Sequence, residues 1–273
     1  YDRAVLERCW DKIDFISAHR YSNNDRQDPA WYLAEGTEID RVIDDYRHLI
    51  GYIRAVKRSD KNIFVSFDEW NVWYRERGEN GQWAEAPRLL EEHYNFEDAL
   101  VCAQYLNSFI RNADVVKIAC LAQIVNVIAP ILTKTDGLLL QSIYHPFALF
   151  SQNAAGLSLC PVVTTPTYKA GARGDVPSLD VSATFDAATE TASIFIVNRD
   201  VDQSVSVKFE DRRIFRTISV TTLGGVDVKA ANTWDAPNTV APKSTGANLV
   251  DGTLTVNAPG PGLIVLKVST AKR

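Results

Sequence analysis

Two adjacent carboxylates, Asp68 and Glu69, end a short apolar run in the segment FVSFDEWNVWY at positions 64–74. The end of a strand fixes a side chain more precisely than a loop does, and aromatic rings stack on the C–H faces of sugars and exclude water. The pattern favours a carboxylate at a sugar-cleaving site, with Glu69 as the first candidate. Spacing alone leaves a second interpretation open, in which Glu69 is a salt-bridged strand end without chemistry.

The neighbours of Glu69 divide between the two faces of the predicted strand. Because side chains alternate along a strand, Asp68 and Trp70 are expected opposite Glu69, where Asp68 would hold local structure and Trp70 would join the core. His19 ends another predicted strand, where a histidine is more often structural than in contact with substrate. Asn71 fits either a loop-bracing or a ligand-contacting role.

The composition is that of an ordinary globular protein with enough apolar residues for a sizeable core. The chain has 273 residues, of which 46% are hydrophobic, and a formal net charge of -5. Acidic and basic residues are interspersed, so we expect neither nucleic acid nor an anionic membrane as a partner. No run of about 18 apolar residues predicts a transmembrane helix, and no segment has the pattern of a signal peptide.

Four cysteines lie far apart, without a CxxC pair or histidines at the spacing of metal ligands. We interpret them as reduced, mostly buried thiols, which favours a reducing compartment and a cytoplasmic location, although two disulfides are formally possible. No metal site is predicted. The chain starts at Tyr1 and contains no methionine, so we expect that it does not begin at a natural initiator. The cysteines are Cys9, Cys102, Cys120 and Cys160.

Residues 1–155 alternate strand-like and helix-like patterns, which predicts parallel strands covered by helices. A capping box of Thr37 and Asp40 is expected at the start of the first long helix. The predicted elements are a strand at 13–19, a helix at 39–56, a strand at 63–67, a helix at 96–112, a strand at 115–121 and a helix at 139–152. Three βα units fit part of a (β/α)₈ barrel or an open doubly wound sheet, and the lack of a glycine-rich turn after the first strand disfavours a nucleotide-binding sheet. His19, Glu69 and Gln123 then lie at the carboxyl ends of three strands.

Residues 156–273 change to alternating β-branched residues broken by Gly, Pro, Asn and Asp, which predicts an antiparallel β-sandwich or jelly roll. Strands are expected at 192–197, 204–209, 217–220 and 263–268. The Pro- and Gly-rich stretch 232–252 is interpreted as a long loop. The fold class is therefore α/β plus all-β, with a partial barrel at 1–155 and a β-sandwich at 156–273.

The sequence DEWNVWY at 68–74 resembles the nucleophile segment of the α-L-arabinofuranosidases of glycoside hydrolase family 51. The segments ISAHRY at 16–21, NFEDAL at 95–100 and 113–131 are similar to other segments of the family, with Ala18 where a larger aliphatic residue is common. The resemblance is specific over about residues 1–150. The β-rich tail resembles the family only loosely, at the DGTL turn of 251–254.

The resemblance implies that Glu69 is the nucleophile and that Tyr21 forms a hydrogen bond near it. It also implies that Trp73 walls the arabinose pocket, that Gln123 reaches a sugar hydroxyl, and that His19 lies at the same pocket. The implied activity is exo-acting removal of terminal arabinofuranose from arabinan, arabinoxylan or oligosaccharides, with retention of configuration and without cofactor or metal. A homo-oligomer, often a hexamer, is implied for the full-length protein.

The resemblance also implies one component that the sequence does not supply. A retaining glycosidase needs a second carboxyl about 5–5.5 Å from the nucleophile, and the family's acid/base glutamate, preceded by asparagine, has no counterpart upstream of Glu69. We therefore expect the carboxyl-terminal half to two-thirds of such an enzyme, inactive on its own. Two alternatives are a retaining β-glucan or xylan hydrolase of the same clan and a non-catalytic carbohydrate-binding protein. The second is disfavoured because Trp234 and Tyr168 are the only Trp and Tyr of the tail.

Overall fold

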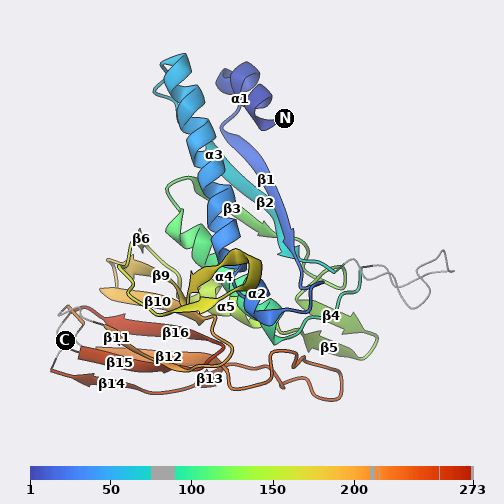
Figure 1. Cartoon of the computed structure of the whole chain (residues 1–273), viewed down its shortest axis with the longest axis vertical. Helices are drawn as coiled ribbons and strands as arrows, with labels where there is room; N and C mark the ends of the chain where they lie inside the picture. The colour runs from blue at the N-terminus through green and yellow to red at the C-terminus, as the bar shows by residue number, and fades with distance from the viewer. Residues whose placement is uncertain (75–89, 210–212, 215, 252, 272–273) are drawn as a thin grey trace.

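The fold is described from a computed structural model, for residues 1–74, 90–209, 213–214, 216–251 and 253–271. A small parallel sheet and its helices form one part of the molecule, and antiparallel strands form the other (Figure 1). The long helix α3 runs along the parallel sheet, and the β-rich part packs against α4 and α5 (Figure 1). No helix in the described ranges is long and apolar enough to cross a bilayer.

The parallel sheet has the strand order β1-β2-β3, with both neighbouring pairs parallel. Each strand leads to a helix, as the alternating pattern predicts. The sheet stays open within the described residues and does not close into a barrel. These elements are β1 Phe15–Ser22, α3 Glu35–Lys57, β2 Phe64–Val72, α4 Phe96–Arg111, β3 Val116–Leu121 and α5 Tyr144–Asn153.

The helices differ in how many of their sides are covered. In α3, the buried isoleucines at 39, 43, 50 and 53 lie three, four or seven residues apart, which gives one apolar stripe toward the core. Helix α4 is buried almost all round because it lies between the sheet and the β-rich part. Its apolar residues on several sides are covered by these neighbours, and its buried polar residues, such as Asn107 and Asp98, bond to them.

The predicted capping box at Thr37 and Asp40 is wrong. Helix α3 begins two residues before Thr37 without a side-chain cap, the Thr37 hydroxyl donates to a backbone carbonyl, and Asp40 pairs with Arg111 at 2.6 Å. A capping box does exist at α4, where Asn95 accepts from the Asp98 backbone and the Asp98 side chain accepts from the Asn95 backbone. The tertiary pairing with Arg111 thus overrides the local signal.

The region between β3 and α5 contains a hairpin that the sequence pattern did not predict. Strands β4 Ile131–Lys134 and β5 Gly137–Leu140 pair antiparallel, so α5 begins later than the predicted position 139. Short helices precede β1 and α3, at α1 Asp2–Cys9, η1 Trp10–Lys12 and α2 Pro29–Tyr32.

The β-rich part has two facing antiparallel sheets, in the orders β13-β12-β16-β10-β9-β6 and β11-β15-β14. The apolar cluster between them makes this a β-sandwich, as predicted. The stretch 232–252 is not one loop, since it contains β13 and β14. The strands are β6 Leu157–Leu159, β9 Leu179–Asp186, β10 Thr191–Asn198, β11 Val205–Phe209, β12 Arg216–Gly224, β13 Lys243–Ser244, β14 Ala247–Val250, β15 Thr253–Ala258 and β16 Gly262–Ser269. A separate pair joins β7 Thr167–Lys169 to β8 Asp175–Pro177, with η2 Gly171–Arg173 between them.

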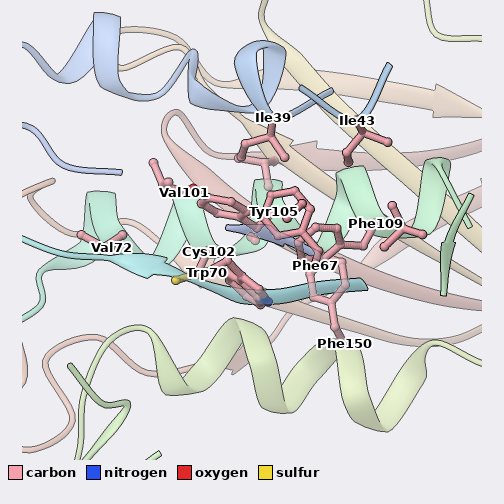
Figure 2. Packing of buried hydrophobic residues seen from close by; sticks show 14 of the residues in the cluster. Ile39, Ile43, Phe67, Trp70, Val72, Val101, Cys102, Tyr105, Phe109 and Phe150 are labelled. Atoms are coloured by element: carbon pink, nitrogen blue, oxygen red, sulfur yellow. The ribbon is translucent and has the colours of Figure 1, made fainter. Parts of the chain in front are cut away.

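The largest core cluster lies between β2, α3, α4 and α5 (Figure 2). Phe67 and Trp70 of β2 both contact Tyr105 and Phe109 of α4, and the Trp70 and Tyr105 rings stack with centroids 4.9 Å apart. The predicted core position of Trp70 is confirmed, because it is fully buried. Contacts between these rings fix the position of β2 along α4 and the direction in which its side chains point.

Polar and aromatic contacts join the helices to the sandwich. Phe150 of α5 stacks on Phe195 of β10 at 4.1 Å. Arg111 of α4 contacts Asp180 of β9 at 2.9 Å, and Asp180 also accepts from Asn107 at 2.8 Å. The sandwich is therefore packed on the side of α4 and α5 that faces away from the parallel sheet.

Candidate active site

Glu69 lies inside β2 rather than after it, because the strand continues to Val72 instead of ending near position 67. Between β1 and β2 the register passes from Ser17 opposite Ser66 to His19 opposite Glu69. One residue of β1 is thus matched by two residues of β2, which is a β-bulge. A bulge changes the direction of the side chains that follow it, so strict alternation does not hold here.

The bulge places Asp68 and Glu69 on the same face of the sheet, and the prediction that they point to opposite faces is wrong. Both carboxylates contact His19: Glu69 Oε2 lies 2.8 Å from Nδ1, and Asp68 Oδ1 lies 3.1 Å from Nε2. Ser17 donates to Asp68 Oδ1 at 2.7 Å, and its Oγ lies 3.2 Å from His19 Nε2. The two strands therefore present one connected polar group on the accessible face of the sheet.

Tyr21 holds the other oxygen of the Glu69 carboxylate. Its hydroxyl donates to Glu69 Oε1 at 2.5 Å, which is the hydrogen bond that the resemblance implies. Burial, followed by the bond to Glu69, raises the pKa of the Tyr21 hydroxyl above its ordinary value, so the hydroxyl keeps its proton and remains a donor. The Tyr21 ring also meets Trp73 edge-on, with centroids 5.0 Å apart.

The polar group is accessible, in contrast to the opposite face of the strands. The side chains of His19, Asp68 and Glu69 are 53%, 40% and 41% exposed. Glu69 Oε1 accepts from Tyr21 and Oε2 lies against His19 Nδ1, while enough of the side chain is exposed for a ligand to approach. A carboxylate fixed in this way can act as a nucleophile or as a proton acceptor.

Gln123 follows β3 at the same edge of the sheet as Glu69, and its side chain is exposed. The preceding residue donates its backbone N–H to the carbonyl of Trp70, which places the 122–130 segment beside the end of β2. The peptide bond between Ala122 and Gln123 is cis. The described contacts of Gln123 are those of its backbone, so its predicted role with sugar stays a prediction.

Asn71 braces the segment that carries Gln123. Its buried side-chain amide donates to the carbonyls of Ala122, at 2.7 Å, and Ile128, and its oxygen accepts from Val72 N. Of the two roles open to Asn71, the structure shows the loop-bracing one. The pattern offered no signal that would distinguish these roles, because the partners of Asn71 are backbone groups about 50 residues away.

A buried acidic residue supports β2 from the side of α4. Tyr74, which follows β2, donates to Asp98 Oδ1 at 2.7 Å, and Tyr32 donates to the same oxygen at 3.1 Å. Burial raises the pKa of the Asp98 carboxyl to about 7. Tyr74 adjoins Trp73, so this network sets where the end of the strand lies.

The described residues contain no group of three or more His, Cys, Asp or Glu that could hold a metal ion. The four cysteines are free thiols, as expected, but Cys120 and Cys160 are exposed rather than buried. Cys120 is on β3, an edge strand of the open sheet, which leaves it without a covering element among the described residues.

A family model described as the α-L-arabinofuranosidase C-terminal domain matches residues 68–260. Among curated proteins, the chain is 36% identical to an intracellular exo-α-(1→5)-L-arabinofuranosidase of Acetivibrio thermocellus, over 93% of this chain and 53% of the relative. It is 38% identical to the corresponding Bacillus subtilis protein, over 92% of this chain and 51% of the relative. The chain thus spans about half the length of these relatives.

Solved structures give the same result. A family 51 α-L-arabinofuranosidase from Bifidobacterium longum superposes with a TM-score of 0.90 at 28% identity, over 98% of this chain and 55% of that chain. An α-L-arabinofuranosidase from Thermotoga maritima, solved as an arabinose complex, gives 0.83 at 28% identity over the same shares. The sequence match, the family model and the superposition agree, and the chain therefore belongs to the α-L-arabinofuranosidases of glycoside hydrolase family 51.

Proposed function

We propose that the chain supplies the nucleophile side of a retaining, exo-acting α-L-arabinofuranosidase, with Glu69 as the nucleophile. The observation that carries this proposal is the fixed, half-exposed Glu69 carboxylate, which accepts a hydrogen bond from Tyr21 on one oxygen and lies 2.8 Å from His19 Nδ1 with the other. The DEWNVWY segment around it resembles the family's nucleophile segment, and the named activities of the relatives support the substrate class.

In the proposed first step, a Glu69 oxygen attacks the anomeric carbon of a terminal arabinofuranose as the bond to the leaving group breaks. The electron pair of that bond goes to the leaving oxygen, which takes a proton from a second carboxyl. Water then attacks the anomeric carbon of the ester, gives a proton to the second carboxyl, and returns the electron pair to Glu69. Two inversions produce net retention, and the chemistry requires no metal or cofactor.

The other site residues have defined places in this proposal. Tyr21 orients Glu69 and adjusts its charge as the ester forms and breaks. Trp73, in edge contact with Tyr21, walls the pocket for the sugar ring. Gln123 reaches a sugar hydroxyl from the end of β3. Among the described residues, the groups in contact with Glu69 are His19 and Tyr21, and neither is a second carboxyl. We propose that residues 1–273 alone do not turn over unactivated substrates.

We also propose how the fold relates to that of the complete enzyme. The parallel sheet β1-β2-β3 with its helices corresponds to part of a (β/α)₈ barrel, with domains at 1–155 and 156–273 that divide between α5 and β6. The relatives are named intracellular enzymes, and a cytoplasmic location is proposed for this protein. The substrates are arabinan or arabinoxylan side chains and arabino-oligosaccharides, and the full-length protein is proposed to be a homo-oligomer.

Covalent trapping tests the nucleophile independently of the second carboxyl. The probe is a 2-deoxy-2-fluoro arabinofuranoside that carries a dinitrophenolate leaving group. This leaving group departs without protonation, and the fluorine slows breakdown of the ester. We expect peptide mass spectrometry to find the sugar on Glu69, and the Glu69→Gln variant to take up none. A label on another carboxylate would overturn the assignment.

Hydrolysis of an α-(1→5)-linked arabino-oligosaccharide, whose leaving oxygen needs a proton, tests the need for a second carboxyl. We expect no turnover by residues 1–273 and turnover by a longer protein that contains them. Turnover by residues 1–273 alone would show that both carboxyls lie within this chain, and the proposed division of the site would be wrong.

A further inference from the structure

The end of β1, which carries Tyr21, is held by the carboxylate of Glu35. The two neighbours of Tyr21 in the strand are Arg20 and Ser22. Because side chains alternate along a strand, these two point to the helix-covered face while Tyr21 points to Glu69. Both donate to Glu35 Oε1 in the first turn of α3, Arg20 Nε at 3.0 Å and Ser22 Oγ at 2.9 Å. The backbone on either side of Tyr21 is therefore tied to one oxygen atom.

The other oxygen of Glu35 is bound by a residue of the β-rich part. Arg173 lies in η2, between β7 and β8, and one of its terminal nitrogens donates to Glu35 Oε2. The other donates to the carbonyl of Trp31 at 3.0 Å, and the guanidinium lies over the Trp31 ring, 4.0 Å from its centroid. A planar guanidinium can form both bonds and stack at the same time. Tyr168 of β7 donates to the Ala30 carbonyl at 3.1 Å, so the whole β7–β8 hairpin is seated on α2.

These charged side chains are largely removed from water. The side chains of Glu35 and Arg173 are 4% and 11% exposed. A buried carboxylate is stable only while its charge is paired and its oxygens are bonded. Removal of Arg173 would leave Glu35 Oε2 without this donor, beside a cavity of about 330 Å³ that water can enter. The carboxylate would turn toward that water, and Arg20 and Ser22, which are bonded to it, would move with it.

We propose that Arg173 is a positioning residue: by fixing Glu35, it holds the Tyr21 hydroxyl against the nucleophile. The inference deepens the proposed function and rests on Glu69 being that nucleophile. Among the described contacts of Arg173, none is with Tyr21 or Glu69, so it acts through the Glu35 carboxylate. The β-rich part thereby sets the geometry of the site as well as stabilising the fold.

Fluorine NMR of residues 1–273 labelled with meta-fluorotyrosine tests the position of Tyr21 without any turnover. The Tyr21→Phe variant identifies the Tyr21 signal, because that signal disappears. In Arg173→Ala we expect the Tyr21 signal to shift or broaden, since the end of β1 loses its fixed point. An unchanged Tyr21 signal in a folded Arg173→Ala variant would overturn the proposal.

A second variant keeps the test decisive if Arg173→Ala does not fold. Glu35→Gln keeps the shape of the side chain and an oxygen that Arg20 and Ser22 can bind, but it turns an amide donor toward the guanidinium donor of Arg173. It therefore breaks the contact with Arg173 selectively. We expect the Tyr21 signal to move in Glu35→Gln too, and an unchanged signal would overturn the proposal.

Arg111→Ala is the matched control for the loss of an arginine between the two parts of the molecule. Arg111, the last residue of α4, also binds a carboxylate of α3, Asp40 at 2.6 Å, and donates to the carbonyl of Val181 in β9 at 3.1 Å. We expect Arg111→Ala to lower the melting temperature and to leave the Tyr21 signal unchanged. If it moved that signal as far as Arg173→Ala does, general loosening would explain both shifts and the proposal would fail.

This outcome is separate from that of the proposed function. If trapping leaves Glu69 unlabelled while the Tyr21 signal moves in Arg173→Ala, the nucleophile assignment fails and the contact chain from Arg173 to Tyr21 stands. If Glu69 is labelled and the Tyr21 signal does not move, the inference about Arg173 fails alone.

Kinetics of the active, longer protein give a second readout. We expect Arg173→Ala to lower kcat by about threefold to tenfold, less than complete loss of the Tyr21 hydroxyl would, because displacement only weakens its bond to Glu69. In the Tyr21→Phe background the same change should cost less than about twofold, since the hydroxyl that Arg173 positions is already absent. A purely structural defect would slow both backgrounds equally, and that result would contradict the proposal.

Discussion

The two faces of β2 have different functions although their residues lie within one strand of nine residues. On the covered face, Phe67 and Trp70 are fully buried against α4. On the open face, Asp68 and Glu69 are about 40% exposed and contact polar groups of β1. The comparison teaches that the packed face fixes the strand, so the open face can hold accessible carboxylates in one geometry.

The largest effect should come from the open face and should leave the fold unchanged. We expect Glu69→Gln to lower kcat of the active, longer protein by about 10⁴-fold or more, because an amide cannot form and release the ester. The melting temperature should stay within a few degrees, since the side chain is half exposed. Residual turnover within tenfold of wild type would remove Glu69 from the mechanism.

The second effect should come from the covered face and should act on stability. Trp70→Ala leaves a cavity between β2 and α4 where the ring stacks on Tyr105 and meets Phe109. We expect a loss of about 3–5 kcal/mol in the free energy of unfolding, measured with denaturant. Trp70→Phe, the control, keeps an aromatic ring and should lose less. Equal losses in the two variants would mean that Trp70 packing does not anchor the strand.

The sequence predicted those features of the fold and the site that depend on local interactions. The helical period of α4 and the alternation of β10 depend on neighbouring residues, so these elements were predicted within one or two positions. The DEWNVWY segment likewise pointed to Glu69 from its own composition. Features that depend on distant partners were predicted less well. A capping box was predicted for α3 at Thr37 and is absent there, whereas α4 has one at Asn95.

The site itself required information that no local pattern contains. The bulge exists only because β2 pairs with β1, about 50 residues earlier, and it reverses the expected direction of Asp68. The contacts of His19 and Ser17 with Asp68 follow from that reversal. Asn71 binds carbonyls at Ala122 and Ile128 that only the fold brings near.

A third prediction concerns the buried network beneath the site. The pKa of Asp98 is raised by burial to about 7, above the ordinary value of 3.8, so the folded protein binds this proton more tightly than the unfolded chain does. The resulting stabilisation is complete below pH about 4 and is lost as the pH rises through about 7. We expect wild type to lose a few kcal/mol of unfolding free energy over this range from Asp98.

The Asp98→Asn variant sharpens this prediction because it removes the titration with little change in shape. We expect its unfolding free energy, from denaturant curves between pH 4 and pH 8, to fall less steeply with pH than that of wild type. Asp136→Asn is the control, since Asp136 is an exposed carboxylate beside Lys134 and should leave the wild-type slope intact. Parallel pH profiles of wild type and Asp98→Asn would contradict the assigned role of Asp98.

The smallest expected effect tests whether the open face contributes to catalysis without contributing to stability. Tyr21→Phe keeps the ring against Trp73 and deletes only the hydroxyl that donates to Glu69. A hydrogen bond to a charged group is worth about 1.5–3 kcal/mol, so kcat of the active protein should fall about tenfold to a hundredfold. Tyr46→Phe is a matched control, because it deletes a tyrosine donor to the carboxylate of Asp2 far from the site. We expect Tyr46→Phe to keep full activity and Tyr21→Phe to keep the wild-type melting temperature. Equal losses of activity in Tyr21→Phe and Tyr46→Phe would contradict a specific role of the open face in catalysis. Both variants would then report only the loss of a tyrosine hydrogen bond.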